Sequence, residues 1–127
     1  MKILLLEDEP RAENMLLEYM RRWRIDTVLT DTPQAAVEAL ESGTFDLLIT
    51  DLVMPQMSGT ELAPILRRSE QYRDLPVLMI SGQAKKQDVM DATETGISGS
   101  IAKPFRPNDL KRRIQTILRE RRLLTLE

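Results

Sequence analysis

Polar side chains that can bind cations or phosphate stand where four apolar runs of this sequence end. They are Glu7 and Asp8 after the first of these runs, Asp51 after the second, Ser81 after the third and Lys103 after the fourth. Carboxylates placed close together repel one another, and this repulsion costs stability unless a cation neutralises it. Magnesium suits such a place, because it prefers oxygen ligands, needs few carboxylates and keeps several of its waters. The carboxylates therefore indicate a Mg²⁺ site, provided that the fold brings them together.

The ammonium of Lys103 and the hydroxyl of Ser81 add two groups that favour phosphate chemistry. A dication, an ammonium and a hydroxyl together can contact all three oxygens of a phosphoryl group during its transfer. A carboxylate at the same place can act as the nucleophile and become an aspartyl phosphate. An isolated Asp after a strand more often begins a turn, but the combined set favours Asp51 as a phosphoryl acceptor.

The elements that would position these residues are five apolar, β-rich runs that alternate with helical patterns. The expected strands are residues 2–6, 25–30, 45–50, 77–80 and 97–102, and the expected helices begin near Pro10, Pro33, Thr60, Lys85 and Pro107. Such alternation indicates an α/β fold with a parallel sheet, right-handed connections and helices on both faces. The carboxyl ends of parallel strands share one edge of the sheet, where open α/β sheets place their ligand sites. Glu9, by contrast, is expected in the first turn of a helix, where it favours the helix dipole, rather than among the ligands.

Composition limits the other classes of function. The 127 residues include no cysteine and no histidine, which excludes disulfides, thiolate metal sites and imidazole chemistry within the chain. No apolar run is long enough to span a membrane and the amino terminus lacks a signal-peptide pattern, so a cytoplasmic protein is expected. We expect one domain over residues 1–123, with residues 124–127 as a tail that is either native or a remnant of cloning.

Basic residues in the last expected helix leave two interpretations open. They are Lys111, Arg112, Arg113, Arg119, Arg121 and Arg122. Such a cluster can bind nucleic acid, or it can form a solvated helix face whose cations favour the carboxyl end of the helix dipole. The net charge of −2 and the scarcity of aromatic residues favour the solvated face. We therefore expect no direct binding of nucleic acid or of a membrane.

Four segments carry a resemblance to a known family. They are Leu6-Glu7-Asp8-Glu9, the stretch from Thr50 to Gly59, the stretch from Pro76 to Gly82, and Lys103-Pro104-Phe105. In this order and at these spacings they resemble the receiver domain of two-component response regulators, of the kind found in chemotaxis regulators. The resemblance covers nearly the whole chain and implies a flavodoxin-like, doubly wound (βα)5 fold with a five-stranded parallel sheet of order 2-1-3-4-5.

The resemblance also implies a role for each residue of the site. Asp51 would accept the phosphoryl group, and Ser81 and Lys103 would contact it. The implied magnesium ligands are Glu7, Asp8, Asp51 and the backbone carbonyl of Val53. For Glu7, direct ligation, ligation through water and a position facing solvent all stay open.

The implied partners follow from the same resemblance. The phosphoryl donor would be a phosphohistidine on a sensor histidine kinase or on a phosphotransfer protein, and the downstream effector or output domain is left open. The protein would be a signalling switch, not an enzyme, that catalyses only its own phosphoryl uptake and release. We expect a monomer or a weak homodimer, formed through the fourth helix, the fifth strand and the fifth helix.

One position departs from the family pattern. The third residue before Lys103 is usually Tyr or Phe in the family and belongs to its output switch, but here it is Ser100. Two other functions therefore stay as alternatives, namely a docking module that works without phosphorylation and a phosphatase of the haloacid dehalogenase-like class. Proteins of that class carry the motif Asp-x-Asp, in which a second acid stands two residues after the nucleophile. This chain has Val53 at that position.

Overall fold

The computed structural model describes residues 1–51, 72–81 and 98–126 of the chain. The third and fourth expected helices and Val53 lie outside the described residues, as do the side chains of Ser81 and of residues 121–126. The described elements are β1 (Lys2–Leu6), α1 (Pro10–Arg22), β2 (Asp26–Thr30), α2 (Pro33–Ser42), β3 (Leu47–Asp51), β4 (Val77–Ser81), β5 (Gly99–Ala102) and α5 (Pro107–Leu126).

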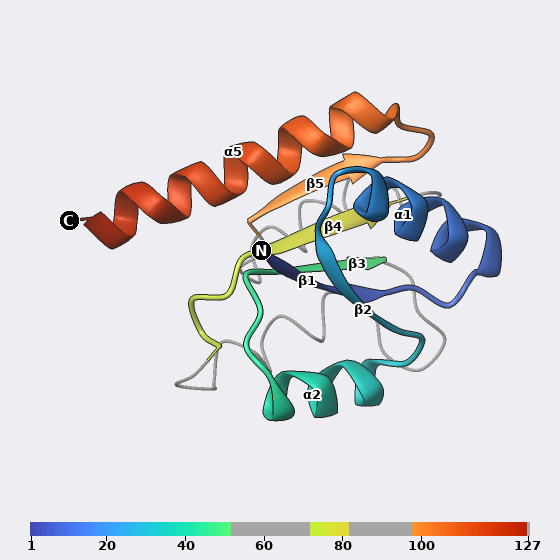
Figure 1. Cartoon of the computed structure of the whole chain (residues 1–127), viewed down its shortest axis with the longest axis horizontal. Helices are drawn as coiled ribbons and strands as arrows, with labels where there is room; N and C mark the ends of the chain where they lie inside the picture. The colour runs from blue at the N-terminus through green and yellow to red at the C-terminus, as the bar shows by residue number, and fades with distance from the viewer. Residues whose placement is uncertain (52–71, 82–97, 127) are drawn as a thin grey trace.

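The strands form one parallel sheet in the order β2-β1-β3-β4-β5, which confirms the predicted order (Figure 1). Strand β1 pairs with both β2 and β3, so Leu6 stands between Thr30 and Thr50. Further along the sheet, Asp51 stands beside Ile80 and Ser81 beside Ala102. The strands therefore end in register along one edge, as a shared ligand site requires.

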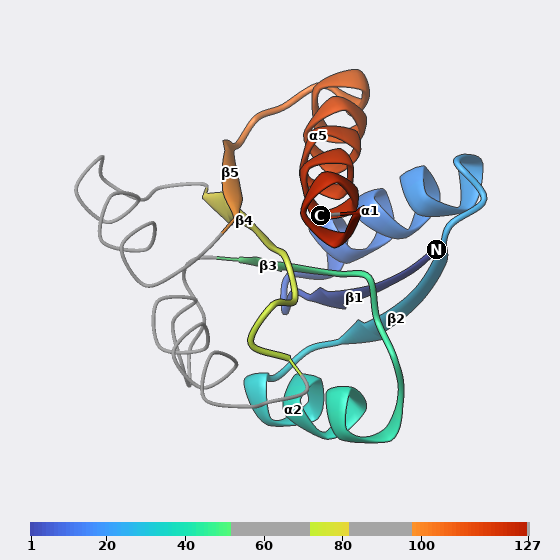
Figure 2. The same ribbon diagram turned by 90° about the vertical axis from the view of Figure 1, so that its left-hand side faces the viewer.

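The helices cover both faces of the sheet. Figure 2 shows α1 and α5 on one face and α2 on the other. Side chains alternate between the two faces along each strand, so Ile3 and Leu5 pack with α1 and α5 while Leu4 and Leu6 pack with α2. Both faces are thus closed by apolar cores, and none of the described helices is long and apolar enough to cross a membrane.

Local sequence explains where the helices begin. Glu9 caps α1 and Thr32 caps α2, and each cap is followed by a proline at the first helical position. The Thr32 hydroxyl accepts a hydrogen bond of 3.1 Å from the amide of Ala35. These two helices therefore start at residues that satisfy otherwise unpaired backbone N–H groups.

Several strand boundaries differ from the predicted ones. The predicted strand 45–50 begins two residues late, at Leu47, and includes Asp51 as its last residue. Phe45 is buried but packs with the α2 layer before the strand begins, so its burial does not depend on β structure. At the carboxyl end of the chain, α5 continues to Leu126 without a break at residue 123, and the predicted division between domain and tail stays a prediction.

Candidate functional site

Two carboxylates and one ammonium meet at the edge where the strands end. Glu7 follows β1, Asp51 is the last residue of β3 and Lys103 follows β5. The Lys103 Nζ lies 3.4 Å from Asp51 Oδ2 and 3.6 Å from Glu7 Oε2. Glu7 and Lys103 are 96 positions apart in the sequence. They meet because the carboxyl ends of parallel strands lie at the same edge of the sheet.

Glu7 is buried, and this corrects one of the possibilities left open for it. Only 1% of its surface is exposed, so a position facing solvent is wrong. The reason lies in the backbone, because the amide of Glu7 donates a 3.0 Å hydrogen bond to the carbonyl of Thr30 and extends the pairing of β1 with β2. The next residue, Asp8, is exposed, as expected for a chain that leaves the sheet there.

The two oxygens of Glu7 have different surroundings. Oε1 accepts a 3.1 Å hydrogen bond from the amide of Glu9. Among the described residues, the buried Oε2 has no hydrogen-bond partner. The only cation within ion-pair distance of it there is the ammonium of Lys103. A buried carboxylate oxygen in this state is costly unless a cation compensates it. It is therefore the position at this edge that most favours an additional positive charge.

The electrostatics of Glu7 support the same conclusion. Burial raises the pKa of the Glu7 carboxyl above its ordinary value of 4.5, and the negative charges of Asp51 and Asp8 raise it further. The hydrogen bond from the Glu9 amide and the charge of Lys103 oppose this increase in the pKa without cancelling it. One ammonium thus compensates the local negative charge only in part.

Glu9 is engaged in helix capping, in agreement with the prediction that it serves the helix at its beginning. Its carboxylate accepts hydrogen bonds of 3.1 Å from the amide of Arg11 and 2.7 Å from the amide of Ala12. These two hydrogen bonds lower the pKa of Glu9 below its ordinary value of 4.5, and the one from Ala12 has the larger effect. The residue is the N-cap of α1, one position before the first turn in which the sequence pattern placed it.

The donor set fits a hard dication, although Lys103 supplies the positive charge in this structure. Among residues 1–51, 72–81 and 98–126, no group of three or more acidic side chains is already gathered as a metal site. Glu7 and Asp51 nevertheless both face the Lys103 ammonium, and the orphaned Oε2 of Glu7 is an oxygen of the kind that Mg²⁺ prefers. Sequence reasoning assigned Lys103 to the phosphoryl group and missed its pairing with Glu7, since no local pattern signals a contact between the first and fifth strands.

The remaining predicted site residues are only partly placed. The backbone of Ser81 is the last position of β4 and pairs with Ala102, next to Lys103 in the sequence. Its side chain, like Val53, lies outside the described residues. Ser81 is therefore at the expected edge of the sheet, and its contact with a phosphoryl group stays a prediction.

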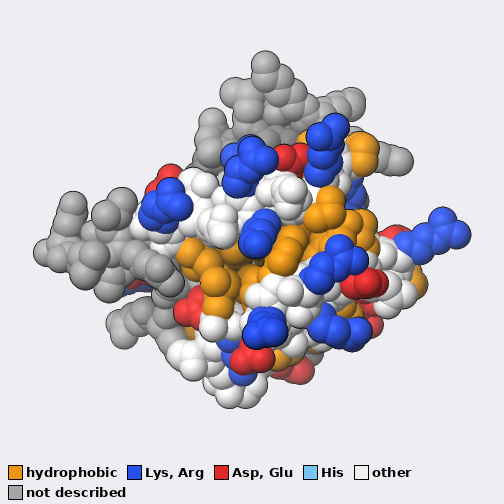
Figure 3. Space-filling view, turned by 45° about the horizontal axis from the view of Figure 1, so that its top comes forward, with side chains coloured by type: hydrophobic (Ala, Val, Ile, Leu, Met, Phe, Trp, Pro, Cys, Tyr) orange, Lys and Arg blue, Asp and Glu red, His pale blue; other side chains and the backbone are white. Residues whose placement is uncertain are grey.

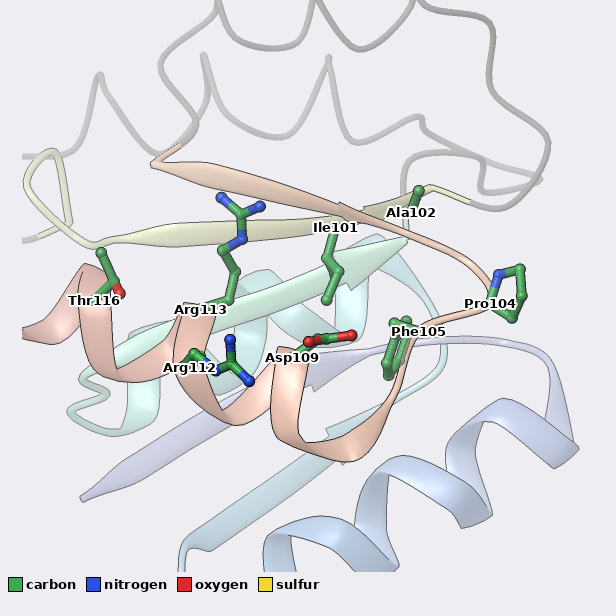
Figure 4. Close-up of a pocket in the computed structure, with 8 residues that line it drawn as sticks. All are labelled: Ile101, Ala102, Pro104, Phe105, Asp109, Arg112, Arg113 and Thr116. Carbon is green, nitrogen blue, oxygen red and sulfur yellow. The ribbon is translucent and has the colours of Figure 1, made fainter.

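A hollow of about 410 Å³ adjoins the Lys103 loop on its other flank, between β5 and α5. Ala102 and Pro104, the two neighbours of Lys103 in the sequence, both line it. Figure 4 shows Arg113 directed from α5 toward β5 across this hollow. Movement of the Lys103 loop would therefore change the shape of a surface that faces solvent.

Comparisons with known proteins agree with this geometry. The family model of the response regulator receiver domain matches residues 3–115. The chemotaxis protein CheY of Pseudomonas aeruginosa is 35% identical over 122 residues, which cover 92% of this chain and 95% of that protein. A putative response regulator from Chloroflexus aurantiacus superposes with a TM-score of 0.87 at 26% identity, covering 92% of this chain and 96% of the other.

A further solved structure bears on the metal. The receiver domain of the sensor histidine kinase PA1611 from Pseudomonas aeruginosa, described with a magnesium ion coordinated in its active site cleft, has a TM-score of 0.85 and 25% identity. The similarity covers 92% of this chain and 96% of that domain.

Proposed function

This chain belongs to the response regulator receiver domain family, and from that membership we propose that it is a phosphorylation-controlled signalling switch that accepts a phosphoryl group on Asp51. The observation that carries the proposal is the Lys103 ammonium held between Glu7 and Asp51, at 3.6 and 3.4 Å. The proposed donor is a phosphohistidine on a sensor histidine kinase or a phosphotransfer protein. A donor on another protein is consistent with a chain that contains no histidine of its own.

In the proposed reaction a carboxylate oxygen of Asp51 attacks the phosphorus of the donor. The new O–P bond forms as the P–N bond to the donor imidazole breaks, and the electron pair of that bond remains on the imidazole. The products are an aspartyl phosphate and a free histidine on the partner. Asp51 suits this role because it ends β3 at the sheet edge and is only partly buried, which leaves the carboxylate accessible.

Within the described part of the chain Lys103 faces the carboxylates of Glu7 and Asp51, and after the reaction it would gain a phosphoryl oxygen as a further acceptor. Its long flexible stem lets the ammonium contact a phosphoryl oxygen on Asp51 without leaving the edge of the sheet. In this way one charge stabilises both the unmodified and the phosphorylated carboxylate. Ser81, one strand away, is proposed as a hydroxyl donor to the same group.

We propose that Mg²⁺ is required for this reaction. The residues that would hold it are Glu7, Asp8, Asp51 and the backbone carbonyl of Val53, and when bound the ion supplies positive charge to the phosphoryl oxygens. Glu7 is the ligand that the structure supports best, because its buried Oε2 has no hydrogen-bond partner among the described residues. Asp8 is exposed at the rim, where it is accessible to a hydrated ion.

Incubation with a small phosphoryl donor and Mg²⁺, followed by intact mass measurement, tests the proposal. We expect a mass increase of one phosphoryl unit that is lost in Asp51→Asn and in the presence of EDTA. Asp31→Asn is the matched control, because Asp31 is an exposed carboxylate that also directly follows a strand, β2, at the same edge. If Asp51→Asn still gains the phosphoryl unit, the acceptor is another residue. If the unmodified protein gains none, a docking module that works without phosphorylation is the better description.

A further inference from the structure

An aromatic pair lies at the border between α1 and α5. Tyr19 and Trp23 are both partly buried against the core, and their rings are stacked with centroids 5.7 Å apart. The Lys111 ammonium, from α5, lies 6.0 Å from the centre of the Trp23 ring, which is within cation–π range. The two helices thus share a half-buried strip where they meet, aromatic on the α1 side and basic on the α5 side.

Residues of α5 continue this strip along the helix. Lys111, Gln115, Leu118 and Arg119 are separated by four, three and one positions, so they lie on one side of the helix. Two adjoining hollows flank them, one of about 220 Å³ near Lys111 and one of about 360 Å³ near Arg119, and Gln115 lines both. Met1, which is 54% exposed, lines the larger hollow together with the half-buried Leu118.

Positive charge surrounds this surface. Figure 3 shows hydrophobic side chains in the middle of one face of the molecule, with many Lys and Arg side chains and fewer Asp and Glu side chains around them. Lys111, Arg112 and Arg119 are exposed and line the two hollows. Aromatic and apolar residues at the centre with arginine at the border are the composition of protein docking sites.

We propose that this surface, the α1–α5 strip formed by Tyr19, Trp23, Lys111, Gln115, Leu118 and Arg119, docks an acidic amphipathic helix of a partner protein. Apolar side chains of such a helix would cover Trp23 and Leu118, and its carboxylates would pair with the surrounding cations. Complementary charge of this kind favours specific encounter and raises the association rate.

Other occupants fit the strip less well. A second copy of the same strip would bring Lys111 and Arg119 against like charges, which disfavours a symmetric dimer through this face. Nucleic acid is disfavoured because the chain carries a net charge of −2. The faces of the aromatic rings are also engaged, since Trp23 is stacked on Tyr19 and approached by Lys111, which leaves little room for bases to stack.

The α1–α5 strip lies away from the phosphoryl site. Met1 precedes β1 and Trp23 follows α1, whereas Asp51 lies at the opposite, carboxyl ends of the strands. Figure 1 shows the carboxyl end of α5 projecting past the end of the sheet where the chain begins. Docking here therefore leaves Asp51 accessible, and the proposal stands independently of phosphorylation.

Trp23 is the only tryptophan of the chain, so its fluorescence reports directly on the strip. The probe is a synthetic amphipathic peptide with Leu on one helical face and Glu on the other, titrated into the full chain at low salt. A peptide with Lys in place of every Glu is its matched counterpart. We expect saturable binding of the acidic peptide, a shift of Trp23 emission, and weaker binding as the salt concentration rises.

Charge reversal identifies the residues responsible. Lys111→Glu/Arg119→Glu should weaken binding of the acidic peptide by at least about tenfold. Arg113→Glu/Arg106→Glu is the matched control with the same change in net charge, since Arg113 lies on the other flank of α5 (Figure 4) and Arg106 precedes the helix. The double variant Lys111→Gln/Arg119→Gln, which removes the two charges without reversing them, repeats the test in case charge reversal prevents folding. Circular dichroism would detect a loss of folding.

Three outcomes would overturn the proposal. One is equal binding of the acidic and basic peptides, and another is equal loss of binding in the strip and control variants. The third is a stronger response of Trp23 to a single-stranded oligonucleotide or to anionic vesicles than to the acidic peptide. Asp51→Asn should bind the peptide as the unmodified protein does, which separates this result from the proposed phosphorylation.

Discussion

At the scale of single residues, the balance of charge around Lys103 decides how the site behaves. One ammonium stands between the carboxylates of Glu7 and Asp51, and the pKa of Glu7 stays raised in spite of that charge, chiefly because of burial. Among the residues that the structure describes, two carboxylates thus face one ammonium at this edge. This arrangement supports the proposed binding of Mg²⁺ and, together with the ion, of a phosphoryl group.

Replacement of Lys103 tests this balance. Lys103→Ala removes the ammonium that faces the buried Glu7 Oε2 among the described residues, so we expect the free energy of unfolding to fall by about 1–2 kcal/mol in EDTA. The effect is moderate because the Lys103 side chain remains 29% exposed. Mg²⁺ should restore more stability to the variant than it adds to the unmodified protein. Thermal melting with and without Mg²⁺ measures both effects, and an equal gain from Mg²⁺ in the two proteins would contradict them.

Glu7 predicts a dependence of stability on pH. Because the pKa of Glu7 is raised in the folded state, folding favours the protonated carboxyl. The contribution of Glu7 to the free energy of unfolding is therefore fully present below the unfolded pKa of 4.5 and is lost as the pH rises through the folded pKa. At neutral pH in EDTA, the neutral variant Glu7→Gln should therefore melt higher than the unmodified protein, by roughly 2–5 °C. The difference should disappear below pH 4.5. A difference that grows at acid pH would show that hydrogen bonding of Glu7, and not its charge, dominates.

At the scale of secondary structure elements, two neighbouring acids after β1 have separate tasks. Asp8 is exposed at the rim of the site, whereas Glu9 satisfies the first amides of α1 with hydrogen bonds of 3.1 and 2.7 Å. The loop that ends β1 therefore exposes one acid beside the proposed metal site and starts a helix with the next.

We expect Asp8→Ala and Glu9→Ala to affect different properties. Asp8→Ala should weaken Mg²⁺ binding measured by calorimetry, while Glu9→Ala should lower the melting temperature through loss of the cap. The pKa of Glu9 is lowered in the folded state, so its contribution is present above the unfolded value of 4.5 and is lost as the pH falls through the folded pKa. The two variants should accordingly melt alike in strong acid. Equal loss of Mg²⁺ affinity in both would refute the division of tasks.

Apolar runs in the sequence predicted the elements well where burial and strand structure coincide. Lys2–Leu6 was predicted to the residue, because its apolar side chains face two cores and the acids that follow end the run. Prediction was less accurate at Phe45, which is buried before β3 begins. The burial of Glu7 was not predictable, since it depends on a backbone hydrogen bond to Thr30 in another strand. Strand order came from the family resemblance, because periodicity alone does not fix which strands pair.

At the scale of the whole molecule, the route from Lys103 to α5 runs through β5. Ser100 pairs with Met79 and is only partly buried, and a Cβ on Gly99 would stand 3.2 Å from Ile117 Cδ1. Gly99 of β5 thus lies close to α5, and its neighbour Ser100 stands at the position where the family resemblance implies a ring. Ile101, the next residue of β5, is the large side chain that joins the core under α5.

The last prediction concerns how far the effect of phosphorylation spreads. A ligand shifts a conformational equilibrium only by its different affinity for the two states, and without a ring at Ser100 one packing contribution to that difference is missing. With beryllofluoride and Mg²⁺ as a phosphoryl mimic, amide NMR should show large shifts near Asp51, Gly82 and Lys103 and small shifts in α5 beyond Asp109. Gly82 lies outside the described residues, as do residues 85–95, for which the sequence predicts intermediate shifts.

Two variants make this prediction specific. Asp51→Asn should abolish the shifts, because the mimic then lacks its acceptor. Ser100→Tyr should extend the shifts along β5, because a ring at this partly buried position can follow movement of the neighbouring loop. The position of Gly99 against Ile117 gives such a movement a direct contact with α5. If the unmodified protein already responds strongly along β5 and α5, the missing ring does not limit the output, and Ile101 becomes the residue to test next.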